Sequence, residues 1–232
     1  MKKTKQMAWL VVAFSILLIP FKVDAATVST TQKKVAITAD DFVYSVLRQT
    51  QWKAREVYYY KNSITKKEYL SELKKVYNGK LGSRQKAAIA ADQVKTTKWV
   101  YPSSIVPQGV GYKSLSKVKN VYKNLFGKST SVDLPSVRSV TQTNKYYLSS
   151  YAKKGNTVLS LSYDAEDDFS SRFVSAKKRG STYIITKQYK YYSHWSIKYR
   201  GEKPTQTVTV RIILKKKTSS PYKYNITGIT FS

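Results

Sequence analysis

The spacing of apolar residues changes along this chain of 232 residues, from a helical period in the first half to alternation in the second. Up to about residue 127, apolar side chains recur every three or four positions, which places them on one face of a helix. From about residue 144 onward, apolar and polar residues alternate, as they do in a strand with one buried face. Helices followed by strands predict an α+β fold, with N-terminal helices packed on one face of a C-terminal antiparallel β-sheet meander.

Capping signals locate the helices. The clearest helix covers 66–77, because Thr65 and Glu68 form a capping box and Gly79 offers a left-handed stop. Helical spacing predicts three more: near 39–50 behind Thr38-x-x-Asp41, with an extension to about 60 left open; over 83–94; and from Ser114 or Ser116 to Gly127. The stretch 102–112 holds two prolines and two glycines and is predicted as loop.

Alternation predicts long strands in the second half of the chain. The positions that share one parity are Tyr183, Ile185, Tyr189 and Tyr191 in one strand and Val208, Val210, Ile212 and Leu214 in another. Turns are expected at 153–156, 177–180 and 219–221, and a break in parity near Gly228 indicates a bulge. We predict one α+β domain over 38–232, with a helical part at 38–127 and an antiparallel sheet at 140–232.

The first 25 residues have the pattern of a signal peptide. Three lysines precede an apolar run from Met7 to Pro20, and cleavage is expected after Ala25. A membrane anchor is the alternative, but a spanning helix needs about 20 apolar residues, and this run is shorter. We therefore predict a secreted, extracellular protein that can associate with the cell wall, without a transmembrane span after cleavage. Residues 26–37 are predicted to be a loose leader.

Charge and cysteine content narrow the function. Without residues 1–25 the chain keeps 42 − 4 = 38 Lys and Arg against 13 − 1 = 12 Asp and Glu, a net charge of +26. Such an excess attracts polyanions and makes association with them sensitive to salt. The chain has no cysteine, which excludes disulfides, thiol catalysis and thiolate metal sites.

Basic residues form the candidate binding site. The predicted polyanion contacts are Lys113, Lys117, Lys119, Lys123, Lys177, Lys178, Arg179, Lys215, Lys216 and Lys217. Within 187–200, basic residues alternate with aromatic ones, and Tyr192 and Trp195 are candidates for an exposed aromatic surface that stacks on bases or sugars. The alternative is that one parity of these rings is core and the lysines form a solvated face.

No catalytic pattern is specific enough to name a reaction. His194 is the only histidine, no nucleophile elbow accompanies it, and it is predicted to be a loop residue. The acidic cluster Asp164, Glu166, Asp167 and Asp168 is predicted to be a solvated hairpin loop, with a Ca²⁺ site as the weaker alternative because the spacing is not that of an EF-hand. We predict no enzyme activity and no cofactor.

Two segments carry a resemblance to a known group of proteins. They are Tyr112–Phe126, followed by long strands, and the terminal hairpin Lys215–Ile229. Together they resemble small secreted proteins of Gram-positive bacteria with NTF2-like or cystatin-like cones, over about 112–232. The resemblance implies a curved sheet wrapped around a helix, and some members of that group inhibit cell-wall hydrolases. It transfers no functional residue to this chain.

These observations favour a secreted, basic, non-catalytic domain that associates with an anionic cell-surface polymer, such as teichoic acid, or with lipid headgroups. Two alternatives stay open. One is a protein-binding module such as a cell-wall hydrolase inhibitor, which would have a secreted protein partner. The other is binding of extracellular nucleic acid.

Overall fold

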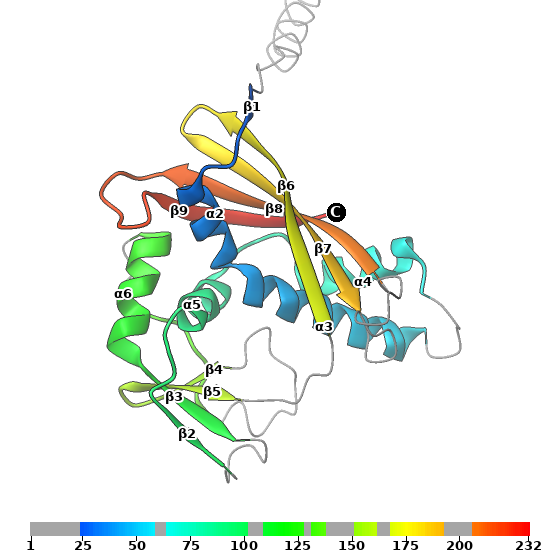
Figure 1. Ribbon diagram of the computed structural model, residues 1–232. Helices are drawn as coiled ribbons and strands as arrows, with labels where there is room; N and C mark the ends of the chain where they lie inside the picture. The colour runs from blue at the N-terminus through cyan, green and yellow to red at the C-terminus, as the bar shows by residue number, and fades with distance from the viewer. Residues whose placement is uncertain are drawn as a thin grey trace, which may run out of the picture.

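A computed structural model describes residues 24–58, 64–101, 109–127, 131–137, 151–161, 168–192 and 206–232. These ranges contain helices and two antiparallel sheets, which confirms the predicted α+β fold class (Figure 1). One sheet has the order β1-β6-β7-β8-β9, with strands Asp24–Ala26, Asp168–Arg179, Thr182–Tyr192, Gln206–Lys216 and Tyr224–Phe231. The other has the order β2-β3-β5-β4, with strands Lys98–Val100, Val110–Ser114, Thr157–Leu161 and Tyr151–Lys154.

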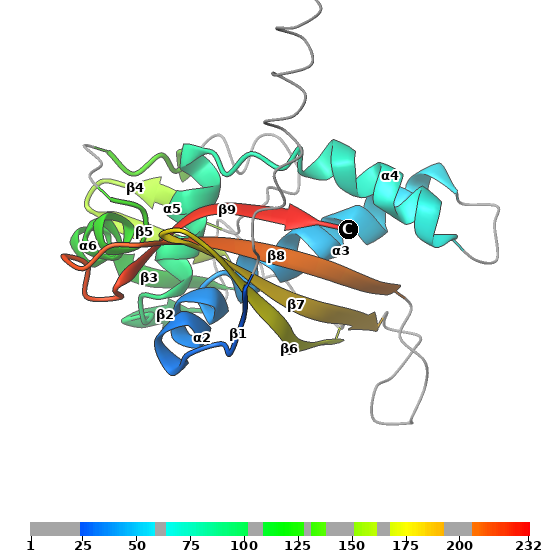
Figure 2. The same ribbon diagram turned by 90° about the horizontal axis from the view of Figure 1, so that it is seen from above.

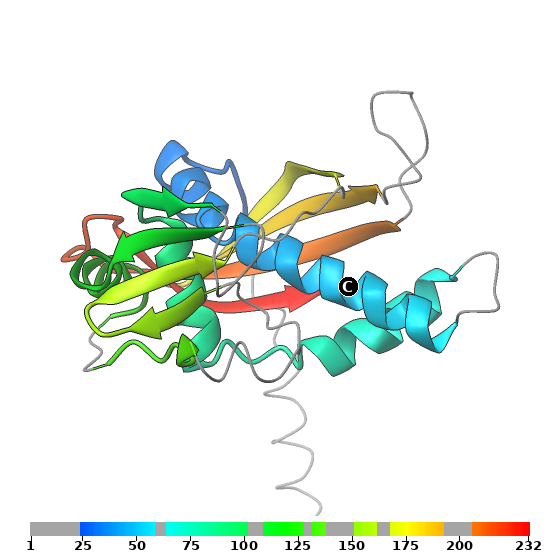
Figure 3. The ribbon, with the colours of Figure 1, turned by 90° about the horizontal axis from the view of Figure 1, so that it is seen from below.

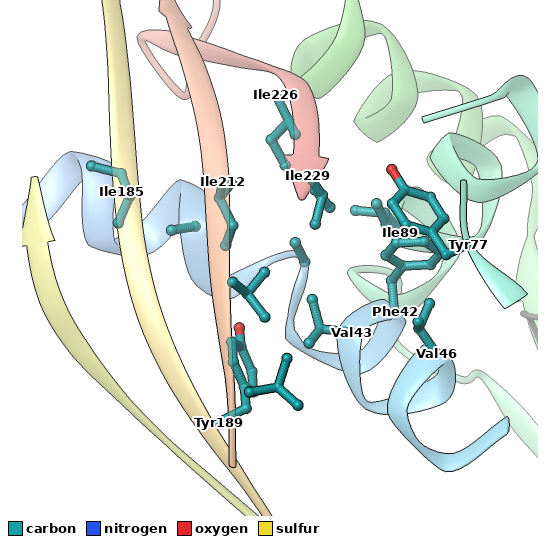
Figure 4. Close-up of a cluster of buried hydrophobic side chains, with 14 of the residues drawn as sticks. Phe42, Val43, Val46, Tyr77, Ile89, Ile185, Tyr189, Ile212, Ile226 and Ile229 are labelled. Carbon is teal, nitrogen blue, oxygen red and sulfur yellow. The ribbon is translucent and has the colours of Figure 1, made fainter. Parts of the chain in front are cut away.

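The helices cover one face of the five-stranded sheet. They are α2 (Thr30–Ile37), α3 (Asp40–Val57), α4 (Lys66–Val76), α5 (Ser83–Asp92) and α6 (Leu115–Phe126). Figure 3 shows α3 crossing this face with α4 beside it. The core lies between them, where Ile185, Ile212 and Ile229 of the strands point toward Phe42 and Val43 of α3 (Figure 4). All five side chains are buried, so hydrophobic burial fixes the helices on this face.

Helix starts follow local side-chain chemistry. The capping box of α4 is confirmed, because the Thr65 hydroxyl accepts from the Glu68 backbone N–H at 3.3 Å and Glu68 Oε2 accepts from the Thr65 N–H at 2.9 Å. Ser114 caps α6 as predicted. The predicted start of α3 differs in detail. Its cap is Ala39, and the Thr38 hydroxyl instead donates to the Val35 carbonyl at 2.7 Å.

The leader is more ordered than the sequence predicted. Residues 26–37 were expected to be loose, but Thr30–Ile37 form α2, behind a capping box of Ser29 and Gln32. Burial of Val35 and Ala36 in the core explains the difference, because a short helix is stabilised mainly by the surface it packs on. The predicted signal peptide lies outside the described residues except for its last two, Asp24 and Ala25. Within the described ranges, no helix has the length and apolar character needed to cross a bilayer.

The second sheet corrects two predictions. The stretch 102–112 was expected to be loop, yet β3 starts at Val110, and the sheet was expected to lie wholly within 140–232. Instead β5 pairs with β3 from the helical half, and β3 pairs with β2. Gly111 in β3 and Gly109 just before it hid the strand, because glycine is usually depleted in strands. This sheet shares a core with α5 and α6 through Val118, Leu115 and Val158.

The bulge follows its predicted position, but two turns are shorter than predicted, because Lys153 and Lys154 continue β4 and 177–179 continue β6. Hairpins close at Gly155 and Gly180, which have positive φ values of 56° and 57°. In β9 the register shifts so that Ile213 faces Gly228 and Leu214 faces Ile226, which leaves Thr227 as the extra residue of a bulge.

Candidate functional site

The register of the five-stranded sheet places six cationic residues on its open face. This is the face opposite the helices, and the ribbon of the sheet is seen from above in Figure 2. The alternation of β7 fixes this placement, because Ile185 and Tyr189 are fully buried against the helices and the residues between them lie on the other face. The paired strands extend the pattern and place on the open face Arg172, Lys177, Arg179, Lys190, Arg211 and Lys215. All are exposed except Lys190, which is half-buried.

A shallow hollow of about 400 Å³ lies among three of these cations. It is lined by Ser175, Lys177, Arg179, Ile184, Thr186 and Arg211. These residues come from three adjacent strands, and Thr186 of β7 lies opposite both Ser175 of β6 and Arg211 of β8. The bulge in β6 at Val174 sits directly beside the hollow. Bulges bend a strand and change the direction of its side chains, so this one shapes the rim.

The lining is rich in hydrogen-bond donors for an anion. Two guanidinium groups, one ammonium group and two hydroxyl groups border the same hollow. Guanidinium matches a phosphate or carboxylate with two parallel hydrogen bonds, and lysine adds a point charge. The lining of the hollow includes no carboxylate, and Asp168, which the register with Tyr192 places on the open face, lies at the opposite end of β6 from Lys177 and Arg179. Arg172 donates to Gln188 Oε1 at 3.0 Å and Arg211 to Ser232 Oγ at 3.5 Å, and both of these acceptor oxygens are uncharged.

The structure brings together part of the predicted set of cations. Lys177, Lys178 and Arg179 end β6, and Lys215 and Lys216 end β8, at the same end of the sheet, because Thr182 of β7 pairs with both Arg179 and Lys215. All five are exposed. Arg172, Lys190 and Arg211 were missed, although the sequence carried a signal for Arg211, which lies between the inward-facing Val210 and Ile212.

The remaining exposed candidates belong to another surface. Lys117, Lys119 and Lys123 project from α6 and are exposed. Lys217 is half-buried, and a Cβ at Gly127, which ends α6, would lie 3.6 Å from its Nζ. A cation is favoured there because the C-terminal end of a helix carries partial negative charge.

Lys113 is buried, which contradicts its prediction as a surface contact. Its segment folds as β3, and its Nζ donates to the Ala91 carbonyl at 2.9 Å and to Tyr151 Oη at 3.3 Å. The Tyr151 hydroxyl donates in turn to Asp92 Oδ1 at 2.6 Å. Burial raises the pKa of Asp92 to about 7 and lowers the pKa of Lys113. This network joins α5 to the four-stranded sheet.

A second buried network joins α3 to the five-stranded sheet. Lys187 is 1% exposed and its Nζ lies 2.6 and 2.7 Å from the two carboxylate oxygens of Asp40. The Tyr189 hydroxyl donates to Asp40 Oδ1 at 2.6 Å. Burial lowers the pKa of Lys187 and raises that of Tyr189. Because these polar atoms satisfy one another, we assign both networks the role of holding helices on sheets.

The aromatic and acidic candidates have different outcomes. The prediction that Tyr192 forms an exposed stacking surface is wrong, because the residue is only 7% exposed. Strand β7 extends through this position, and the largely apolar ring is buried. Trp195 and His194 lie outside the described residues, as do Asp164, Glu166 and Asp167. Asp168 begins β6, where its backbone pairs with Tyr192. Among the described residues, no three metal-ligating side chains lie close enough to hold an ion.

Comparisons of the chain with models of known protein families, with curated protein sequences and with solved structures found no match. The resemblance to NTF2-like and cystatin-like proteins therefore stays a prediction, and the site must be interpreted from its own geometry.

Proposed function

We propose that this protein is a secreted, non-catalytic domain that binds a phosphate-bearing anionic polymer of the cell surface through the open face of its five-stranded sheet. The observation that carries the proposal is the hollow in which Lys177 and Arg179 of β6 meet Arg211 of β8 across β7. Six cations lie on this face among the described residues, and the hollow brings three of them together.

The mechanism follows from the arrangement of charge. A net charge of +26 after residue 25 draws a polyanion toward the protein over distances comparable with the Debye length. Phosphates then settle along the rows of cations that cross the sheet, and Arg179 and Arg211 form paired hydrogen bonds with them. Each neutralised phosphate releases counterions, so affinity falls steeply as salt rises.

Teichoic acid and anionic lipid headgroups both supply phosphates, and we favour teichoic acid. Its phosphates are spaced along a flexible chain, which can follow the cations from β6 to β8, whereas a planar bilayer has to meet the hollow as a flat surface. The shared chemistry is phosphate recognition, and the two sources separate in a binding experiment.

The experiment is sedimentation of the purified protein with cell-wall sacculi, with and without teichoic acid, across a salt series. Vesicles that contain phosphatidylglycerol form a parallel arm. The test variant K177Q/R179Q/R211Q removes three charges from the hollow. The matched control K117Q/K119Q/K123Q removes three exposed charges from α6.

We expect sedimentation that requires teichoic acid, weakens with salt, and is lost in the hollow variant but largely kept in the α6 variant. Equal loss in both variants would show that net charge alone drives binding and would overturn the assignment of the site. Binding to vesicles but not to sacculi would assign the site to lipid headgroups.

A further inference from the structure

Two exposed aromatic rings lie close together at one edge of the four-stranded sheet, Trp99 on the edge strand β2 and Tyr101 just after it. Trp99 is 43% exposed and Tyr101 is 61% exposed. Their ring centroids are 5.6 Å apart and their planes differ by 17°, so the rings are nearly parallel. Both belong to the β2 end of the molecule, at the bottom of Figure 1, whereas the five-stranded sheet is at the top.

Glycines form the floor beneath these rings. Trp99 pairs with Gly111 across the β2–β3 ladder, and a Cβ at Gly111 would lie 3.0 Å from Trp99 Cη2. The Tyr101 ring lies over Gly109 in the same way, where any Cβ would collide with it. The Thr96 methyl also lies over Gly111, 2.8 Å from where its Cβ would be, so Trp99 and Thr96 share this floor, while both rings keep a large part of their surface in solvent. Aromatic rings over edge glycines stabilise a sheet, but that role uses one face only.

Few charged side chains share the face of the sheet on which the exposed parts of the two rings lie. The cross-strand neighbours of Trp99 on its own face are Gly111 and then Ser160. Lys98 precedes Trp99 but lies on the other side of the strand, because successive side chains alternate. Lys113 shares the face of Gly111, but it is buried and bonded to Tyr151.

We propose that Trp99 and Tyr101 form a stacking platform for the sugar rings of a glycan, a second binding site separate from the polyanion surface. The faces of aromatic rings carry negative quadrupole charge and attract polarised C–H groups, which line one face of a pyranose. Two nearly parallel exposed rings, two positions apart in the chain, present an apolar surface to successive sugars of an extended chain. A single-stranded nucleic acid fits less well, because binding of its backbone needs cations next to the stacking rings. The platform rests on the proposed extracellular location, but not on the proposed polyanion site.

The test uses sacculi from which teichoic acid has been extracted, in about 1 M salt, where the Debye length is about 3 Å and charge-driven binding is suppressed. A hexamer of N-acetylglucosamine serves as the soluble competitor. The test variants are W99A and Y101A, and each removes one of the two rings. The control is W52A, because Trp52 of α3 is 45% exposed and so matches Trp99 in type and exposure.

We expect wild type, W52A and K177Q/R179Q/R211Q to sediment and the hexamer to compete, while W99A and Y101A bind roughly tenfold more weakly. W99A and Y101A that both bind like wild type would overturn the platform, and so would the absence of any salt-resistant binding. Binding of oligo-dT that depends on Trp99, without binding of the hexamer, would reassign the rings to nucleic acid. If the polyanion site fails but the platform holds, salt-resistant binding persists while teichoic acid makes no difference.

Discussion

The buried pair of Lys187 and Asp40 should dominate the response of the protein to a single substitution. Its two side chains are 2% and 16% exposed, and Lys187 Nζ contacts both carboxylate oxygens. K187M keeps the volume and the apolar stem, and the Met sulfur would replace an ammonium that lies 4.8 Å from the centre of the Phe173 ring. What the substitution removes is the charge partner of Asp40.

Leaving one buried charge without its partner costs about 3–5 kcal/mol. We expect the lower end, about 3 kcal/mol, because Asp40 keeps the hydrogen bond from Tyr189 and lies in the first turn of α3, where the helix dipole favours a negative charge. The double variant D40N/K187M leaves no buried charge and should recover to within about 1.5 kcal/mol of wild type. The pair should therefore show strong coupling in a double-mutant cycle.

Urea unfolding at pH 7, followed by circular dichroism, measures all four proteins of this cycle. A domain stable by about 5–15 kcal/mol would still fold with the single substitutions, and the slope of the unfolding curve should not change. If the free energy of unfolding of K187M lies within about 1 kcal/mol of the wild-type value, the assignment of a buried ion pair between α3 and β7 is refuted.

Two further measurements test local features. The pKa of Asp92 is raised by burial from 3.8 to about 7, so the folded state binds one more proton than the unfolded state between these values. Asp92 therefore lowers the free energy of unfolding by about 1.4 kcal/mol per pH unit as pH rises through that window. In thermal unfolding, D92N should lose less stability between pH 4 and 7 than wild type. If the stabilities of both proteins change with pH in the same way, Asp92 is not a buried acid. T65A removes one half of the capping box on α4 and should lower the free energy of unfolding by about 1 kcal/mol in urea titration, whereas no change would mean that packing alone holds that helix.

The sequence predicted those features of the fold that depend on near neighbours. The Thr65–Glu68 box, the inward positions of β8 and the bulge near Gly228 all depend on residues within one element or one hairpin. The second sheet was missed because β3 depends on a partner, β5, that lies more than forty positions further along the chain, in the predicted sheet region. Its glycine, Gly111, is unfavourable in an isolated strand and is explained by the Trp99 ring that packs over it.

The candidate site was predictable only in part, for the same reason. Clusters of basic residues at 177–179 and 215–217 are visible in the sequence, but their meeting at one end of the sheet requires the register of β6, β7 and β8. Burial cannot be assigned to a lysine from its neighbours alone. Lys187 finds its carboxylate 147 positions away, and Lys113 becomes an interior residue through contacts with α5 and β4.

The unfolded chain carries the same charges as the folded one, and this allows a shaped site to be separated from net charge. A polyanion that senses only the excess of lysine binds both states and shifts the folding equilibrium little, because stabilisation requires preference for the native state. Lys177, Arg179 and Arg211 converge only when three strands pair, so binding at the hollow must favour the native state. Soluble teichoic acid at low salt should therefore raise the melting temperature of wild type and of K117Q/K119Q/K123Q, but not of K177Q/R179Q/R211Q. Salt alone should also raise the melting temperature of all three proteins, because it screens repulsion among the cations. If teichoic acid likewise raises the melting temperature of all three proteins equally, the open face contributes only charge and not a shaped site.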